Sequence, residues 1–258
     1  MDTNKLALDQ LTVAQIENLL QDDELPIQTV NELEHDTRLT VANLLSRWRK
    51  RQNNLRAEKK RLYDLYKYER QLKENGYQPV AGVDEAGRGP LAGPLVVAAV
   101  ILPVNCEIIS LNDSKQLSAG ERDRIYKEII NSALAIQRCI ISVEQIDKIN
   151  IYQATVQGMM EVLTNLPLTP RAALIDAVKL PKLAIRSLSL VHGDALSASI
   201  AAASIVAKVE RDQIMTELDK KYPLYGFKRH KGYGTAEHMR AIEKYGPCPV
   251  HRLSFEPV

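Results

Sequence analysis

The chain has 258 residues, of which 45% are hydrophobic and 26% are charged, and its formal net charge is +2 at pH 7. This composition is ordinary for a soluble globular protein with one substantial core. The apolar runs are strand-length or are interrupted by charges such as Lys208 and Glu210, which excludes a membrane-spanning helix. The small net charge neither indicates nor excludes a nucleic-acid partner.

The N-terminus and the cysteines indicate the compartment. The first residues are acidic and lack the basic and then apolar pattern of a signal peptide. Cys106, Cys139 and Cys248 form no CxxC pair and cannot all pair with one another. We therefore expect a cytoplasmic protein in which all three cysteines behave as small hydrophobic residues.

Residues 1–75 are expected to form a small, all-helical extension. Thr12 to Gln15 is a capping-box sequence that starts a short helix ending at Leu20. Residues 40–74 contain no Gly or Pro, which predicts one long amphipathic helix. Asn75 and Gly76 would end that helix and mark the boundary with a second domain, residues 76–258.

The long helix is strongly basic. Between Arg47 and Lys73 there are eleven Lys or Arg residues and three acidic residues. Two interpretations remain open. The residues form a solvated helix face, or they form an arm that binds phosphates without regard to sequence.

Strands and helices mix through residues 76–258. Strands are predicted at 80–84, 95–102, 134–143, 172–175 and 184–191, and helices at 118–132, 151–165 and 197–220, with a last helix capped by Thr235 and an extended tail at 247–258. A meander followed by crossovers predicts the α/β class, with a mixed central sheet flanked by helices.

Four acidic residues stand where apolar strands end: Asp84, Glu85, Asp176 and Asp194. Strand ends of an open α/β sheet gather at one edge, where ligands bind. Buried like charges are costly, and two divalent cations would remove that cost. Successive side chains of a regular strand point to opposite faces, so Asp84 and Glu85 can share one site only if the strand kinks. The alternative is that these are scattered surface or capping acids.

Several long motifs carry a resemblance to a known family. They are DEAGRGPLAGPLVVAAVIL, NDSKQLS, LIDAV, GDALSASIAAASIVAKVERD and HKGYGTAEH…GPCPVHRLSF, in unbroken order over residues 78–257. They closely resemble the signature of type II ribonucleases H. The resemblance implies a ribonuclease H-like fold and an endonuclease that hydrolyses RNA in RNA–DNA hybrids or single ribonucleotides embedded in DNA, which would remove misincorporated ribonucleotides. Cleavage on the 5′ side of the ribonucleotide, by two magnesium or manganese ions, would leave a 3′-hydroxyl and a 5′-phosphate.

The resemblance also implies roles for particular residues. The catalytic, metal-binding carboxylates match Asp84, Glu85, Asp176 and Asp194. The glycine-arginine-glycine segment matches Gly87, Arg88 and Gly89, and the tyrosine that probes the RNA–DNA junction matches Tyr233. Glycines let the backbone approach a 2′-hydroxyl, which is the group that distinguishes RNA from DNA. We expect phosphate contacts from Ser114, Lys115 and Lys231.

At four further positions we expect a structural role or little functional effect. Ala177 follows Asp176 where many relatives have glycine, and we expect little functional effect. His35, His238 and His251 have no metal-ligand spacing, which favours structural roles.

We expect a monomer that acts on nucleic acid and not at a membrane. The alternatives are a nuclease that requires runs of ribonucleotides and a non-catalytic nucleic-acid-binding protein.

Overall fold

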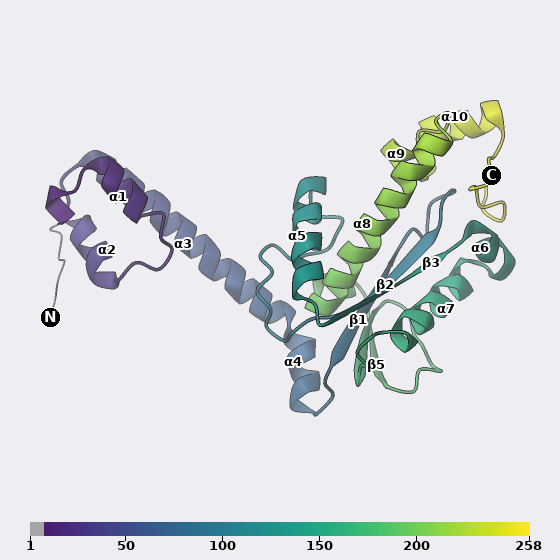
Figure 1. Ribbon diagram of the computed structural model, residues 1–258, viewed down its shortest axis with the longest axis horizontal. Helices are drawn as coiled ribbons and strands as arrows, with labels where there is room; N and C mark the ends of the chain where they lie inside the picture. Colours follow the sequence, from purple (N-terminus) through teal and green to yellow (C-terminus); the bar gives the residue numbers. More distant parts are fainter. Residues whose placement is uncertain (1–7) are drawn as a thin grey trace. The chain divides into compact units, whose positions relative to one another are not determined.

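Figure 1 shows the computed structural model, which describes residues 8–258. The chain divides between Arg61 and Leu62 into two compact units. The predicted boundary between residues 75 and 76 stays a prediction about domain organisation. No helix in the described part of the chain is long and apolar enough to cross a membrane.

The first unit is helical, as predicted. It contains η1 (Leu8–Gln10), α1 (Val13–Leu19), α2 (Ile27–Glu34) and most of α3 (Leu39–Leu65). The capping box is confirmed, because Thr12 and Gln15 exchange side-chain and backbone hydrogen bonds at the start of α1. The apolar faces of these helices bury a small core of Ile16, Leu20, Val30, Leu33, Val41, Leu45 and Trp48.

The prediction of one helix over residues 40–74 is wrong. Helix α3 ends at Leu65, and α4 (Lys67–Glu74) begins after Tyr66. Tyr66 is 1% exposed and packs with Leu65 into the main core of the second unit. The break allows α4 to bury Leu72 in a separate cluster with β1 residue Val80. Residues 62–74 therefore belong structurally to the second unit.

The second unit is built on a mixed sheet with the strand order β3-β2-β1-β4-β5. Strands β1 (Val80–Ala86), β2 (Leu95–Ile101) and β3 (Ala135–Ile141) form the antiparallel meander. Strand β4 (Ala172–Asp176) pairs in parallel with β1, and β5 (Arg186–Leu190) pairs in parallel with β4. The predicted α/β class with a mixed sheet is confirmed.

Helices cover both faces of this sheet (Figure 1). Helix α8 (Ala198–Lys221) and α5 (Ala119–Ser132) share one core with β2, and α7 (Ile151–Thr164) shares the opposite core. A Cβ at Gly82 of β1 would lie 2.0 Å from the backbone carbon of Ser199, so α8 packs directly against the strand. This close approach explains the small residues at the start of α8.

Two local predictions differ from the structure. The strand predicted to end at residue 143 stops at Ile141, because Ser142 caps a further short helix, α6 (Val143–Ile149). The predicted extended tail is instead a series of turns that pairs His251 with Ala92. The tail follows α9 (Phe227–His230) and the Thr235-capped α10 (Ala236–Tyr245).

Candidate active site

Asp84 and Glu85 lie on the part of β1 that extends past β4. The parallel ladder with β4 ends at Val83 opposite Ile175, whereas the antiparallel ladder with β2 continues to Ala86. The register is unbroken, so the strand does not kink at the two acids. Alternation therefore turns the two side chains in opposite directions along the strand. Beyond the end of the β4 ladder, however, the charge of Asp176 still acts on both acids, and Glu85 lines one cleft with Ser204 of α8. The expectation that only a kink would let the two acids share a site is therefore wrong.

Asp176 and Asp194 are joined through the backbone. Asp176 is the last residue of β4, and its Oδ1 accepts a hydrogen bond of 2.7 Å from the backbone N–H of Gly193. Gly193 opens the short turn η2 (Gly193–Ala195) that presents Asp194. The next residue after Asp176, Ala177, has φ +48°, the left-handed region that favours glycine. A glycine would adopt this conformation at lower cost than Ala177.

The four acids affect one another electrostatically. Burial raises the pKa of Asp84 well above its usual value, and the charges of Glu85 and Asp176 raise it further. Burial also raises the pKa of Glu85, although the Arg88 guanidinium, 3.3 Å from its carboxylate, opposes that effect. The pKa of Asp194 is raised by burial, then by neighbouring carboxylates that include Asp176. The fold thus gathers all four acids at one end of the sheet.

Besides Arg88, Lys115 is a cation that faces this group. Its ammonium nitrogen lies 4.0 Å from the Asp194 carboxylate. Burial lowers the pKa of Lys115, but the charges of Asp194, Asp113 and Asp84 outweigh burial and raise it. Lys115 is therefore held near the acids by their combined negative charge.

The donor set suits a hard divalent cation, since carboxylate oxygens are the ligands that magnesium and manganese prefer. The side chain of Glu85 is 9% exposed, and its Oε2 has no hydrogen-bond partner among residues 8–258. A bound cation would satisfy that oxygen and neutralise the neighbouring charges. Within the same residues, no three Asp, Glu, His or Cys side chains already stand in metal-ligand geometry.

A cleft of about 420 Å³ opens beside Glu85. It is lined by Glu85, Ala86, Gly87, Arg88, Gly89, Ser114, Lys115, Arg122, Ser204, Lys208, Arg211 and Tyr233. Apart from Glu85, its charged lining is basic, which suits a phosphate backbone. The Tyr233 ring lies against Gly89, where an added Cβ would meet the ring edge at 3.8 Å.

Two buried arginines that sequence reasoning missed hold the loop between β1 and β2. Arg252 donates hydrogen bonds to the carbonyl oxygens of Gly87, Arg88 and Gly93. Arg211 donates to the carbonyl oxygens of Pro94, Ala92 and Lys231. The sequence signal for Arg211 was its position among the small or apolar residues on the buried face of α8. Both arginines thereby fix the positions of carbonyl groups in this loop.

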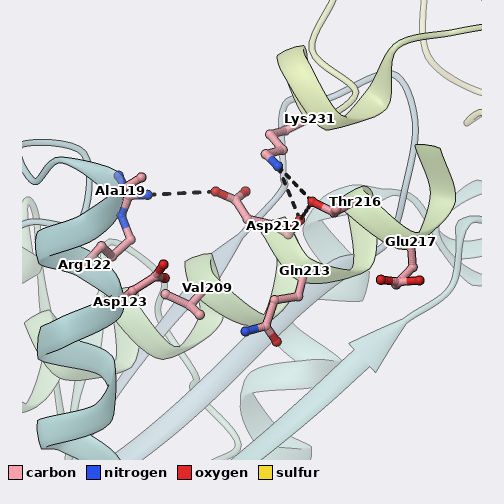
Figure 2. A pocket seen from close by; sticks show the side chains of 9 residues that line it. All are labelled: Ala119, Arg122, Asp123, Val209, Asp212, Gln213, Thr216, Glu217 and Lys231. Carbon is pink, nitrogen blue, oxygen red and sulfur yellow. Dashed lines mark hydrogen bonds and ion pairs between the residues drawn. The ribbon is translucent and has the colours of Figure 1, made fainter. Parts of the chain in front are cut away.

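The expected phosphate-binding residues are only partly brought together. Ser114 is buried and its hydroxyl lies 2.9 Å from that of Ser204. Lys231 does not line the cleft; its ammonium group points into a neighbouring pocket of about 320 Å³, where it donates to Thr216 and to the Asp212 carbonyl (Figure 2). Arg122 lines both cavities and lies 3.9 Å from the Asp212 carboxylate.

Comparisons with known proteins identify the family of this chain. The family model for ribonuclease HII matches residues 81–258, and the model for the ribonuclease HII N-terminal domain matches residues 12–73. The chain belongs to the ribonuclease HII family. It is 48% identical over 257 residues to ribonuclease HII of Bacillus cereus, covering 97% of this chain and 98% of that protein.

Two solved structures are similar to the second unit's fold. Ribonuclease H2 from Pyrococcus horikoshii has a TM-score of 0.60 at 27% identity and covers 69% of this chain and 93% of its own. The ribonuclease HII of Archaeoglobus fulgidus, solved in complex with PCNA, has a TM-score of 0.59 at 26% identity and covers 69% and 95%. Family membership makes the chain a ribonuclease H, a metal-dependent endonuclease that acts on nucleic acid. It also argues against the non-catalytic alternative.

Proposed function

We propose that this ribonuclease H cleaves the phosphodiester on the 5′ side of a ribonucleotide, including a single ribonucleotide embedded in duplex DNA. The products are a 3′-hydroxyl and a 5′-phosphate, and the cellular role is the removal of misincorporated ribonucleotides. The observation that supports this best is the group of four mutually interacting acids beside a basic cleft that ends in Gly89 and Tyr233.

In this proposal Asp84, Glu85, Asp176 and Asp194 hold two magnesium or manganese ions. When bound, such ions lower the pKa of the attacking water and stabilise the charge that develops on the leaving oxygen. Asp84 is 5% exposed and lies next to both Glu85 and Asp176, so it would help to hold both ions. Lys115, close to Asp194, then holds a substrate phosphate beside the carboxylates.

Selection of the ribonucleotide is assigned to the loop with Gly87, Arg88 and Gly89. Its carbonyls are engaged by buried Arg252, so the backbone is held in one conformation before the substrate arrives. The space at Gly89 allows a sugar to approach the backbone, where the 2′-hydroxyl can form a hydrogen bond. Tyr233, 47% exposed at the same place, stacks on the adjacent sugar and senses whether it is deoxyribose.

The test is nicking of a labelled DNA duplex that carries one ribonucleotide, beside an all-DNA duplex and an RNA–DNA hybrid, with and without magnesium or manganese. The proposal predicts metal-dependent nicking on the 5′ side of the single ribonucleotide and no nicking of all-DNA. Cleavage of the hybrid alone would support a nuclease that requires runs of ribonucleotides. We further propose that the protein is a monomer and is located in the cytoplasm. The mass of the purified protein in solution tests the monomeric state.

A further inference from the structure

Three buried histidines lie directly behind Tyr233. His230, His238 and His251 are 9%, 0% and 2% exposed. The rings of His230 and His238 stack with their centres 4.5 Å apart, and the Nε2 atoms of His238 and His251 are 3.0 Å apart. The spacing of these residues in the sequence favours a structural role for His238 and His251. Their hydrogen bonds show a more particular arrangement.

The contacts of His238 with Tyr233 and of His251 with Cys248 bear on which nitrogen of each ring is protonated. At one end, His238 Nδ1 lies 3.0 Å from the carbonyl oxygen of Tyr233. A carbonyl can only accept, so this nitrogen carries a proton. At the other end, His251 Nδ1 lies 2.9 Å from the backbone nitrogen of Cys248, whose N–H can donate to it. It also lies 3.2 Å from both the Sγ and the carbonyl oxygen of Cys248, so these contacts by themselves allow either protonation of Nδ1.

The protonation of His238 decides the direction of the hydrogen bond between the two Nε2 atoms. A neutral His238 protonated at Nδ1 has an unprotonated Nε2 that accepts a hydrogen bond. A neutral His251 unprotonated at Nδ1 carries its proton on Nε2 and can donate it. His251 Nε2–H therefore donates to His238 Nε2. Burial supports the neutral forms, since it lowers the pKa of both rings, that of His238 to about 4.

The reverse arrangement fails at Tyr233. It would place an unprotonated His238 Nδ1 against the Tyr233 carbonyl, which is repulsive and leaves a buried nitrogen without a partner. At the other end a protonated His251 Nδ1 could still donate to the Cys248 carbonyl oxygen, so the contact with Tyr233 decides the direction of the relay.

We infer that Cys248, His251 and His238 form a one-directional hydrogen-bond relay that fixes the backbone of Tyr233 and thereby its recognition of the RNA–DNA junction. The relay joins the first turn of α10 to the turn from Cys248 to His251, which is bridged in turn to Ala92. Ala92 belongs to the same loop as Gly89, so the relay connects the backbone of Tyr233 with the loop that contains Gly89. His238 and His251 are positioning residues, because neither lines the cleft.

The relay rests on the proposed role of Tyr233, and two variants at one position test it. His251→Gln keeps an amide N–H at the distance of Nε2, so it can still donate to His238. His251→Asn keeps an oxygen near Nδ1 that can accept from the Cys248 N–H but cannot reach His238. The readout is the ratio of kcat/KM on the single-ribonucleotide duplex to kcat/KM on a uniform RNA–DNA hybrid.

The relay predicts that His251→Asn lowers this ratio about fivefold to tenfold, as expected for loss of one buried hydrogen bond. His251→Gln should stay within about twofold of the wild type. Equal ratios in the two variants would overturn the relay, because filling the core would then be all that His251 does.

Two further measurements separate the relay from the role of Tyr233. Nuclear magnetic resonance of the imidazole nitrogens at pH 7 should show His238 neutral with its proton on Nδ1 and His251 neutral with its proton on Nε2. Either opposite tautomer overturns the relay, whatever the activity. In a Tyr233→Ala variant the ratio should fall at least as far as in His251→Asn; an unchanged ratio refutes junction sensing by Tyr233, while the tautomers still decide on the relay.

Discussion

The Oδ1 of Asp176 accepts a hydrogen bond from the backbone N–H of Gly193, 2.7 Å away, and this contact ties the end of β4 to the turn that presents Asp194. One residue beyond the ladder between β1 and β4, Asp84 stands beside Asp176. Backbone geometry therefore determines how three acids from distant parts of the chain are spaced, before any cation contributes.

Gly193→Ala should reduce activity by disturbing this contact. The new Cβ would meet Ile200 Cδ1 at 2.6 Å and Asp176 Oδ1 at 3.2 Å, so both must shift. We expect a loss of about 1–3 kcal/mol in the free energy of unfolding and a fall in kcat of about tenfold. Denaturant unfolding and steady-state kinetics measure the two effects.

The matched control is Gly158→Ala, whose Cβ would meet Ile141 and Val97 side chains at 2.7 and 2.8 Å on the α7 face. It should lose comparable stability and keep its kcat. If both variants lose activity equally, the effect of Gly193→Ala comes from general loosening of the core.

Removing one of the buried acids should stabilise the metal-free protein. Burial and the charges of Glu85 and Asp176 raise the pKa of Asp84, which means that its ionised form is unfavourable in the folded state. Asp84→Asn removes that charge, so the free energy of unfolding at neutral pH without divalent metal should rise by about 1 kcal/mol or more. Thermal unfolding in a chelating buffer measures it. A variant less stable than the wild type in that buffer contradicts the electrostatic account.

Gly89→Ala separates folding from substrate selection. Gly89 has no strained φ, and a Cβ there would meet only the Tyr233 ring edge, at 3.8 Å. Stability should therefore change by less than about 0.5 kcal/mol, whereas the methyl group would occupy the space through which a ribose reaches the backbone. We expect kcat/KM on the single-ribonucleotide duplex to fall at least about tenfold. Gly120→Ala, in open space on α5, is the control, and retention of full activity by Gly89→Ala would remove Gly89 from the recognition site.

The basic part of α3 has a test of its own. Arg47, Lys50 and Arg56 are exposed on this helix. If they bind phosphates, changing all three to Gln in the full-length chain should lower the slope of log affinity against log salt by up to about 2–3. Fluorescence anisotropy with a labelled duplex measures that slope. An unchanged slope would make this face a solvated surface. Deleting residues 1–75 is a poorer test, because it would remove Leu65 and Tyr66 from the main core of the second unit.

Much of this architecture could be predicted from local sequence signals. Capping residues such as Thr12, Ser118 and Thr235 mark helix starts that the structure confirms. The order of apolar segments predicted the mixed sheet. The break at Tyr66 could not be predicted, because tertiary burial of that side chain causes it and no Gly or Pro marks it.

Part of the candidate site could likewise be predicted from the sequence, and part of it could not. Position at strand ends predicted that the four acids would gather, but their faces depend on register. The unbroken pairing of Glu85 with Val97 could not be read from the chain. The roles of Arg211, Arg252 and His251 depend on carbonyls and rings brought from far along the sequence, which no local pattern encodes.

The most direct test of the central claim is metal-dependent nicking of the single-ribonucleotide duplex by four separate variants, Asp84→Asn, Glu85→Gln, Asp176→Asn and Asp194→Asn. Asp123→Asn, in the neighbouring pocket, is the control. If the four acids jointly hold the cations, each variant should lose at least about a hundredfold in kcat while still binding the duplex, and the control should nick normally. A folded variant of any one of the four acids that nicks at the wild-type rate would contradict the account.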